Sequence, residues 1–228
     1  MLDTQGKQVP GFKSYVQTYV PAPLEWKIKP WFQIDLKRLL EWYSDLESNY
    51  QECKFVYGEN KQVWTEQIDD PTGRTGHIMP PESFWYVLTF AGNQKGALPP
   101  IAKNVTDEYK EQWTDKELNP RYCFNGYGLD IIKQMPARVR KIQISSHAPG
   151  HQLILHQDST DNIRFHIALK TNEHCWWEIA GERVHIPADG WVYLVNTSLP
   201  HRVYNLGDSE RVHLYGKVWT EDVLNSQT

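Results

Sequence analysis

The sequence predicts a mainly β protein, a barrel or sandwich with flanking helices. Residues 164–169 and 192–195 are short runs rich in β-branched and aromatic side chains, as strands require. Turn sequences at 180–182 and 188–190, each with a glycine, separate such runs. Many short strands divided by turn residues are typical of closed or stacked antiparallel sheets.

The first 125 residues are expected to form a helix- and loop-containing portion that packs on the barrel. Residues 1–30 contain many polar residues and prolines and are expected to run over the surface before Trp26 and Trp31 dock. Residues 70–76 and 92–100 are expected to be loops and are candidate lids. A helix is predicted to open at Asp35, a good N-cap residue, because apolar residues follow it at helical spacing: Leu36, Leu39, Leu40, Tyr43 and Leu46.

Residues 126–219 are expected to form the barrel core. Residues 126–134 predict a second short helix that stops before Pro136. Residues 139–145 alternate as a strand and begin the barrel. A chain of 228 residues lies within the range that barrels with helical additions occupy as one unit, so a single domain is expected over residues 1–228.

Composition excludes several classes of protein. The net charge is −4 and lysines and arginines are not clustered, so no nucleic-acid partner is expected. Cys53, Cys123 and Cys175 are widely spaced and form no Cys-x-x-Cys pair, which indicates reduced thiols in a cytoplasmic protein. The chain shows no leader pattern and no long apolar run, so neither secretion nor a membrane partner is expected.

The sequence His156-Gln157-Asp158 is the first candidate metal-binding feature. Residues two apart in a strand leave the same face, so one ion could take both side chains. His201 follows a strand-like run and is the candidate third ligand. Two histidines and one carboxylate leave open coordination positions, as in Fe(II) oxygenases. The alternative is a surface pair, because His-x-Asp arises readily by chance in a chain with nine histidines.

Two arginines are candidates for holding an anion inside the barrel. Arg211 lies ten residues after His201 in the alternating segment 210–215. Arg164 and His166 share one strand face, opposite the apolar face of residues 165, 167 and 169, so the polar pair is expected to point inward. An interior arginine pairs either with a bound carboxylate or with an acidic side chain, and both partners stay open here.

The remaining histidines are not at ligand spacing. Most of them are expected at the surface or behind the site, namely His147, His151, His174, His185 and His213. Of these, His213 shares the strand face of Arg211 and is expected to line the pocket. Of the pair Trp176-Trp177, one ring must face the barrel interior by alternation, with a core role favoured over a substrate contact.

The order of these motifs resembles a known family. The matching positions are Ser145, Pro149-Gly150, His156-x-Asp158, Arg164-x-His166, Thr171-Asn172, Gly181-Glu182, Pro200-His201, Asn205 and Arg211-Val212-His213-Leu214. The pattern is similar to the aspartyl/asparaginyl β-hydroxylases, a family of Fe(II)- and 2-oxoglutarate-dependent dioxygenases, and particularly to bacterial members such as the proline cis-4-hydroxylases. The resemblance covers roughly residues 130 to 218.

The resemblance implies a double-stranded β-helix, a cupin-like jelly roll, with Fe(II) held by His156, Asp158 and His201. It implies 2-oxoglutarate as cosubstrate, with Arg211 on its distal carboxylate, and ascorbate as a further candidate cofactor. Arg164, His166 and Ser145 become additional contacts to the cosubstrate. The implied reaction uses O2 to hydroxylate an amino acid or an amino-acid residue in a peptide.

Two other functions stay open at this point. A cupin-type metal isomerase or thiol dioxygenase would keep the metal barrel and change the reaction, although Arg211 together with Asp158 argues against it. A non-catalytic jelly-roll binding module would make the histidines structural.

Overall fold

The computed structural model describes residues 20–56, 82–89, 120, 122–153 and 155–226. The helices in these residues are α1 (Leu36–Asn49), the short 3-10 helix η1 (Gln51–Cys53), α4 (Gly126–Lys133) and α5 (Thr220–Asn225). The strands are β1 (Ile28–Gln33), β2 (Lys54–Val56), β3 (Phe84–Val87), β4 (Val139–His147), β5 (Asn162–Lys170), β6 (Cys175–Ile179), β7 (Glu182–Val184), β8 (Trp191–Val195), β9 (His201–Asn205) and β10 (Arg211–Trp219).

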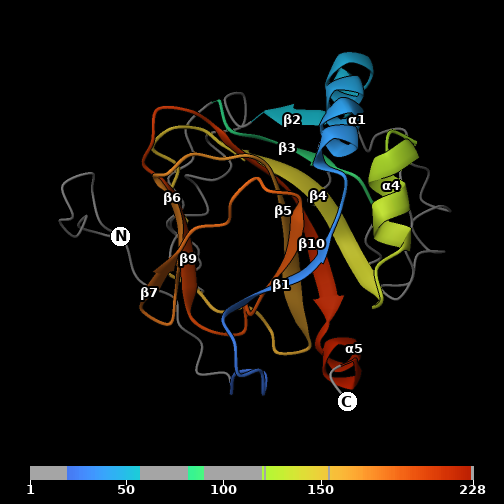
Figure 1. Cartoon of the computed structure of the whole chain (residues 1–228). Helices are drawn as coiled ribbons and strands as arrows, with labels where there is room; N and C mark the ends of the chain where they lie inside the picture. The colour runs from blue at the N-terminus through green and yellow to red at the C-terminus, as the bar shows by residue number, and fades with distance from the viewer. Residues whose placement is uncertain (1–19, 57–81, 90–119, 121, 154, 227–228) are drawn as a thin grey trace, which may run out of the picture.

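The strands form two antiparallel sheets that face each other (Figure 1). The larger sheet has the order β1-β8-β5-β10-β4-β3-β2, and the smaller one has the order β7-β6-β9. From β5 the chain passes to β6 and β7 in the smaller sheet, back to β8, across to β9 and back to β10, so this part of the chain winds around one interior. This is the double-stranded β-helix, or jelly roll, that the sequence predicted.

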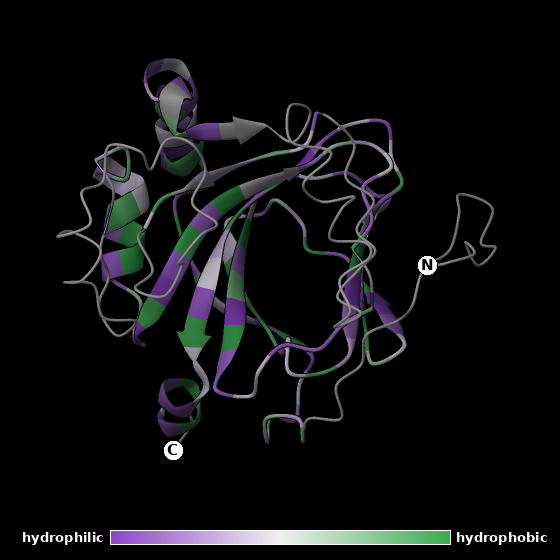
Figure 2. Cartoon of the chain, turned by 180° about the vertical axis from the view of Figure 1, so that it is seen from behind, coloured by the Kyte–Doolittle hydropathy of each residue, from purple (hydrophilic) through white to green (hydrophobic). Residues whose placement is uncertain are grey.

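The two faces of the larger sheet differ in character. Along β5 and β10 hydrophilic and hydrophobic residues alternate, which Figure 2 shows as bands of colour. Phe165, Ile167 and Leu214 are buried in one apolar cluster with the side chains of α1 and α4, on the outer face of the sheet. The inner face therefore receives the polar residues of the same strands, as the alternation predicted for β5.

Helix α1 begins as expected. Asp35 caps it by accepting a hydrogen bond from the backbone nitrogen of Arg38 at 3.1 Å. Leu39, Tyr43 and Leu46 are buried, but Leu40 is exposed, so the apolar stripe is narrower than the sequence suggested. The second predicted helix is α4, and Figure 1 shows it beside α1 against the larger sheet.

The portion ahead of residue 126 contributes more than a helix and loops. Its strands β1, β2 and β3 extend both ends of the larger sheet, which the sequence did not predict. Strand β1 tolerates Pro30 because it is an edge strand, and its register with β8 is irregular between Pro30 and Phe32. The expected loops at 70–76 and 92–100 lie outside the described residues.

Two further expectations concern the cysteines and the helices. Cys53, Cys123 and Cys175 are all buried and form no disulfide. Within the described residues, none of the helices combines the length and the apolar character that crossing a membrane requires.

Candidate metal centre

His156, Asp158 and His201 come together at one side of the barrel interior. Their nitrogen and oxygen ligand atoms all lie within 4.8 Å of one another. The backbone fixes this arrangement, because the amide nitrogens of His156 and His201 each donate to the other's carbonyl oxygen, at 2.9 and 2.8 Å. The Asp158 amide donates to the Thr197 carbonyl at 2.9 Å, which holds this segment against the loop before β9.

The His201 ring is held in one tautomer. Its Nδ1 lies 2.8 Å from the Leu199 carbonyl oxygen, which can only accept, so Nδ1 carries the hydrogen and Nε2 keeps its lone pair. Burial, together with the charge of His156, lowers the pKa of His201 to about 3. A neutral imidazole whose other nitrogen is hydrogen-bonded to a carbonyl is the usual form of a metal-binding histidine.

Asp158 forms an ion pair with Arg164. Arg164 Nε donates a hydrogen bond to Asp158 Oδ2 at 2.8 Å. Burial by itself raises the pKa of Asp158, but the Arg164 guanidinium outweighs burial and holds that pKa well below its usual range. The carboxylate is therefore ionised and oriented. Of the two partners that the sequence left open for Arg164, the structure supplies the acidic side chain.

Arg211, the first residue of β10, occupies the other side of the interior and is only 3% exposed. Its Nη1 lies 3.3 Å from His147 Nδ1 and its Nη2 lies 3.1 Å from His213 Nδ1. Arginine can only donate, so both imidazole nitrogens accept. Burial, followed by the positive charges nearby, holds the pKa values of His147 and His213 well below the usual value, so both rings are neutral.

The charge of Arg211 is consequently not neutralised by the two histidines that contact it. No carboxylate pairs with it in the part of the chain that the structure describes. Burial lowers the pKa of Arg211 to about 10, which still leaves it charged at neutral pH. A buried guanidinium between two neutral acceptors is costly unless an anion completes its environment.

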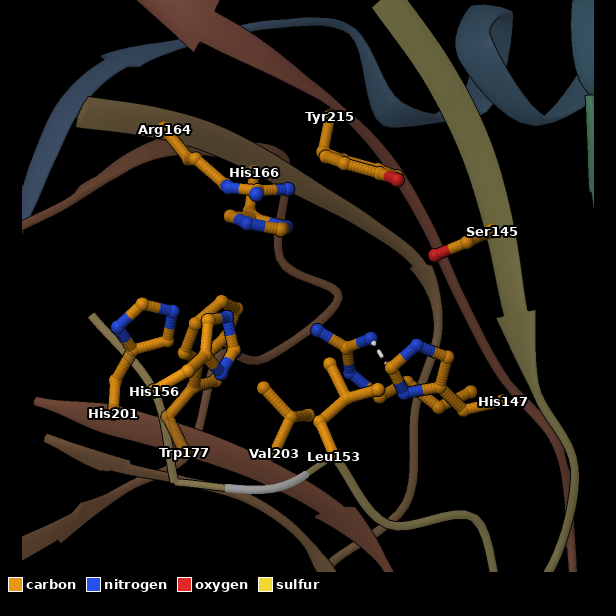
Figure 3. A pocket seen from close by; sticks show the side chains of 11 residues that line it. Ser145, His147, Leu153, His156, Arg164, His166, Trp177, His201, Val203 and Tyr215 are labelled. Carbon is orange, nitrogen blue, oxygen red and sulfur yellow. Dashed lines mark hydrogen bonds between the residues drawn. The ribbon is translucent and has the colours of Figure 1, made fainter. Parts of the chain in front are cut away.

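A cavity connects the two sides, and Figure 3 shows His156 and His201 across it from Ser145 and His147. The lining side chains are Ser145, His147, Leu153, His156, Arg164, His166, Trp177, His201, Val203, Arg211 and Tyr215.

His166 lies within this cavity with unsatisfied polar atoms. Its ring stacks on Tyr215 at a centroid distance of 5.2 Å and meets the edge of Trp177 at 4.8 Å. Neither ring nitrogen has a hydrogen-bond partner among the described residues, although His166 is only 4% exposed. Because buried polar atoms are normally satisfied, the cavity is suited to a polar ligand.

The other histidines are placed differently from the sequence-based expectation. His147 lines the cavity, and its ring stacks on that of His151 with centroids 3.7 Å apart. His213 contacts Arg211 but does not line the cavity. His174 and His185 are exposed, as expected. Trp177 is the ring of its pair that faces the interior, and Tyr215 could have been predicted there because it shares the strand face of Arg211.

Comparison with known families agrees with this site. Residues 127–221 match the family model described as aspartyl/asparaginyl beta-hydroxylase. This segment belongs to that family. The hydroxylase-family segment contains every residue predicted for the site: Ser145, His156, Asp158, Arg164, His166, His201 and Arg211. The candidate metal centre therefore lies within the matched segment.

Solved structures with some similarity include cupin domains. A predicted oxalate decarboxylase from Thermotoga maritima is 18% identical, with a TM-score of 0.30 over 36% of this chain and 67% of its own. The Cnp3 cupin domain of Schizosaccharomyces pombe is 15% identical, with a TM-score of 0.32 over 45% of this chain and 77% of its own. A search of curated proteins found no match.

Proposed function

We propose that the protein is an Fe(II)- and 2-oxoglutarate-dependent dioxygenase that hydroxylates an amino acid or an amino-acid residue in a peptide. The observation that carries the proposal is the pairing of a His156–Asp158–His201 cluster with the uncompensated cation Arg211 in one cavity. The cluster suits an ion with open positions, and the cation suits a carboxylate.

The donor set fits Fe(II). Two imidazoles and one ionised carboxylate match the facial triad of non-haem iron oxygenases. When bound, the metal supplies the redox chemistry that couples oxidative decarboxylation of 2-oxoglutarate, to succinate and CO2, with insertion of one oxygen atom of O2 into a substrate C–H bond. Arg164 keeps Asp158 ionised and oriented toward the centre.

The far side of the cavity fits the distal carboxylate of 2-oxoglutarate. A guanidinium can donate two parallel hydrogen bonds to a carboxylate, and the neutral partners of Arg211 leave its charge for that ligand. The Ser145 hydroxyl and the His166 ring, which both line the cavity, are available to the same ligand. Trp177 and Leu153 cover the cavity with apolar surface and so limit the access of water.

An anaerobic titration tests the proposal. Fe(II) is added first and 2-oxoglutarate second, and the weak visible charge-transfer band of the chelate is monitored. Succinate, which lacks the keto group, is the matched control and should give no band. Iron uptake without a band would favour a metal isomerase or a thiol dioxygenase, and no iron uptake would favour a binding module.

A further inference from the structure

The loop before β9 contacts both segments that carry the candidate metal ligands. We call this loop, residues 196–199, the polar loop. Three of its successive carbonyl groups accept hydrogen bonds from those segments. The bonds are Asp158 N to Thr197 O at 2.9 Å, Gln157 Nε2 to Ser198 O at 2.5 Å and His201 Nδ1 to Leu199 O at 2.8 Å. The conformation of the polar loop therefore determines how Asp158 and His201 are held.

The polar loop is buried, although it belongs to neither a helix nor a strand. Asn196, Thr197 and Ser198 are each 0% exposed. Polar groups in such a position need partners within the protein, because water does not reach them. Two partners lie inside the loop, since the Ser198 hydroxyl donates to Asn196 Oδ1 and the Leu199 amide donates to the Asn196 carbonyl at 3.2 Å. These internal bonds shape the loop but do not attach it to the rest of the barrel.

Segment 22–27, which precedes β1, attaches the polar loop from outside. Three hydrogen bonds join the two: Ala22 N to Ser198 Oγ at 2.8 Å, Asn196 N to Lys27 O at 2.8 Å and Asn196 Nδ2 to Trp26 O at 3.4 Å. The first is a buried bond between residues that are 176 positions apart in the sequence. The other two continue the pairing of β1 with β8 beyond the ends of both strands. Segment 22–27 also lies outside residues 127–221, the part that matches the family model.

We infer that docking of segment 22–27 on the polar loop is coupled to metal binding, which makes the segment a positioning element of the metal centre. The inference rests on the metal site of the proposed function. Segment 22–27 holds the loop, and the loop carbonyls hold Asp158 and His201, so an ion meets donors that are already in place. Coupling between two sites is reciprocal, so a bound ion also holds segment 22–27 on the loop.

Hydrogen exchange on the unmodified full chain tests the effect of the metal on the segment. Zn(II) is the probe, because it takes histidine and aspartate ligands and is stable in air. Exchange of single amides is followed by NMR with a chelator and with saturating Zn(II). The amides of Ala22 and Asn196, which join segment and loop, should exchange at least about fivefold more slowly with zinc. The Ile142 amide, which donates to Thr89 Oγ1 at 2.9 Å, is the control and should change less. No slowing at Ala22 and Asn196, or equal slowing at Ile142, overturns the inference.

A pair of variants tests the effect of the segment on the metal. Ser198→Ala removes the hydroxyl that accepts from Ala22 and leaves all the loop carbonyls in place. Thr89→Val is the matched control, because it also removes a buried hydroxyl that accepts from a backbone amide. Urea unfolding should show similar losses of stability in both variants.

Their metal affinities should differ. Anaerobic calorimetry should show that Zn(II) and Fe(II) bind at least about fivefold more weakly to Ser198→Ala than to the wild type, with no change in Thr89→Val. A merely structural role of Ser198 would move stability alone. Equal metal affinities in the two variants therefore overturn the inference.

The two proposals fail in different ways. If metal affinity depends on Ser198 but no amino acid or peptide stimulates succinate formation, the coupling stands and the dioxygenase proposal falls. If succinate formation is stimulated but both variants bind metal equally, the dioxygenase proposal stands and the coupling falls. A wild-type chain that binds neither metal ion overturns both.

Discussion

Arg164 and Asp158 are joined by a hydrogen bond from Nε to Oδ2 of 2.8 Å, between β5 and the segment that carries two of the candidate metal ligands. Both side chains are largely enclosed, with exposures of 25% and 16%. The pair is also backed by Tyr215, whose ring centroid is 5.7 Å from the guanidinium. Arg164 thus acts on the metal centre through a ligand.

Replacing Arg164 should therefore weaken metal binding. Arg164→Met keeps the length of the side chain but frees Asp158, and loss of such an outer partner typically costs about 10–100-fold in metal affinity. Anaerobic calorimetric titration with Fe(II) measures the effect, and Arg183→Met, an exposed arginine over Trp176, is the control. Unchanged iron affinity with weaker 2-oxoglutarate binding would instead make Arg164 a cosubstrate contact, as the sequence had implied.

Removing the carboxylate itself should have a larger effect. Asp158→Ala deletes one of three ligand groups, so iron affinity should fall by more than in Arg164→Met, and succinate formation should no longer be coupled to hydroxylation. The control is Asp161→Ala, an exposed acid three residues further on. Calorimetry and succinate assays measure the two effects. Full turnover in Asp158→Ala would exclude Asp158 as a ligand.

Local patterns in the sequence predicted much of this site. Alternation correctly placed Arg164 and His166 on the inner face of β5, because a strand repeats every two residues whatever the rest of the fold does. The order of the motifs along the chain also predicted that His156 and His201 would lie at one site. These features depend on short-range geometry or on a resemblance, and both are readable from one sequence.

Contacts between distant strands were not predictable in the same way. His147 meets Arg211 because β4 and β10 are paired with His147 opposite Arg211, and nothing local to either residue encodes that register. The positions of Arg140 and Arg164 opposite Lys217 depend likewise on the registers of β10 with two neighbours. Strand β1 was missed because Pro30 is acceptable only at a sheet edge, and edge position is a property of the whole sheet.

The affinity of Arg211 for the cosubstrate should depend on its two histidine partners being neutral. His213→Asn keeps a neutral acceptor near the position of Nδ1 and should leave 2-oxoglutarate affinity within a few fold, whereas His213→Asp places a carboxylate beside the guanidinium. The Asp variant should bind 2-oxoglutarate at least about tenfold more weakly than the Asn variant, with iron binding intact. Calorimetry on both variants measures this difference. Equal affinities would mean that the charge of Arg211 does not hold the cosubstrate.

The buried neutral histidines should make stability depend on pH. Burial holds the folded-state pKa of His147 well below the value of 6.5 for an unfolded chain. At a pH between these two pKa values, His147 is protonated only in the unfolded chain. The stability that results is complete above pH 6.5 and is lost as the pH falls below it, by about 1.4 kcal/mol per such histidine at pH 5.5. Urea unfolding with a chelator at pH 7.5 and 5.5 should therefore show a smaller loss for His147→Asn than for the wild type. Identical losses would show that His147 is protonated in the folded protein.

The contact between α1 and α4 should reverse the usual effect of replacing a helical glycine. Gly128→Ala would ordinarily stabilise a helix by about 0.5–1 kcal/mol. Here a Cβ at Gly128 would lie 2.5 Å from Cε2 and Cζ2 of Trp42, a ring that is buried and packed against Phe124. Overpacking of this kind costs about 1–3 kcal/mol, so we expect net destabilisation in urea unfolding. The close atoms belong to the six-membered part of the indole, so Trp42→Phe should relieve the clash, and Gly128→Ala should be far less harmful in that background. The same loss in both backgrounds would mean that the helix, and not its contact with α1, requires the glycine.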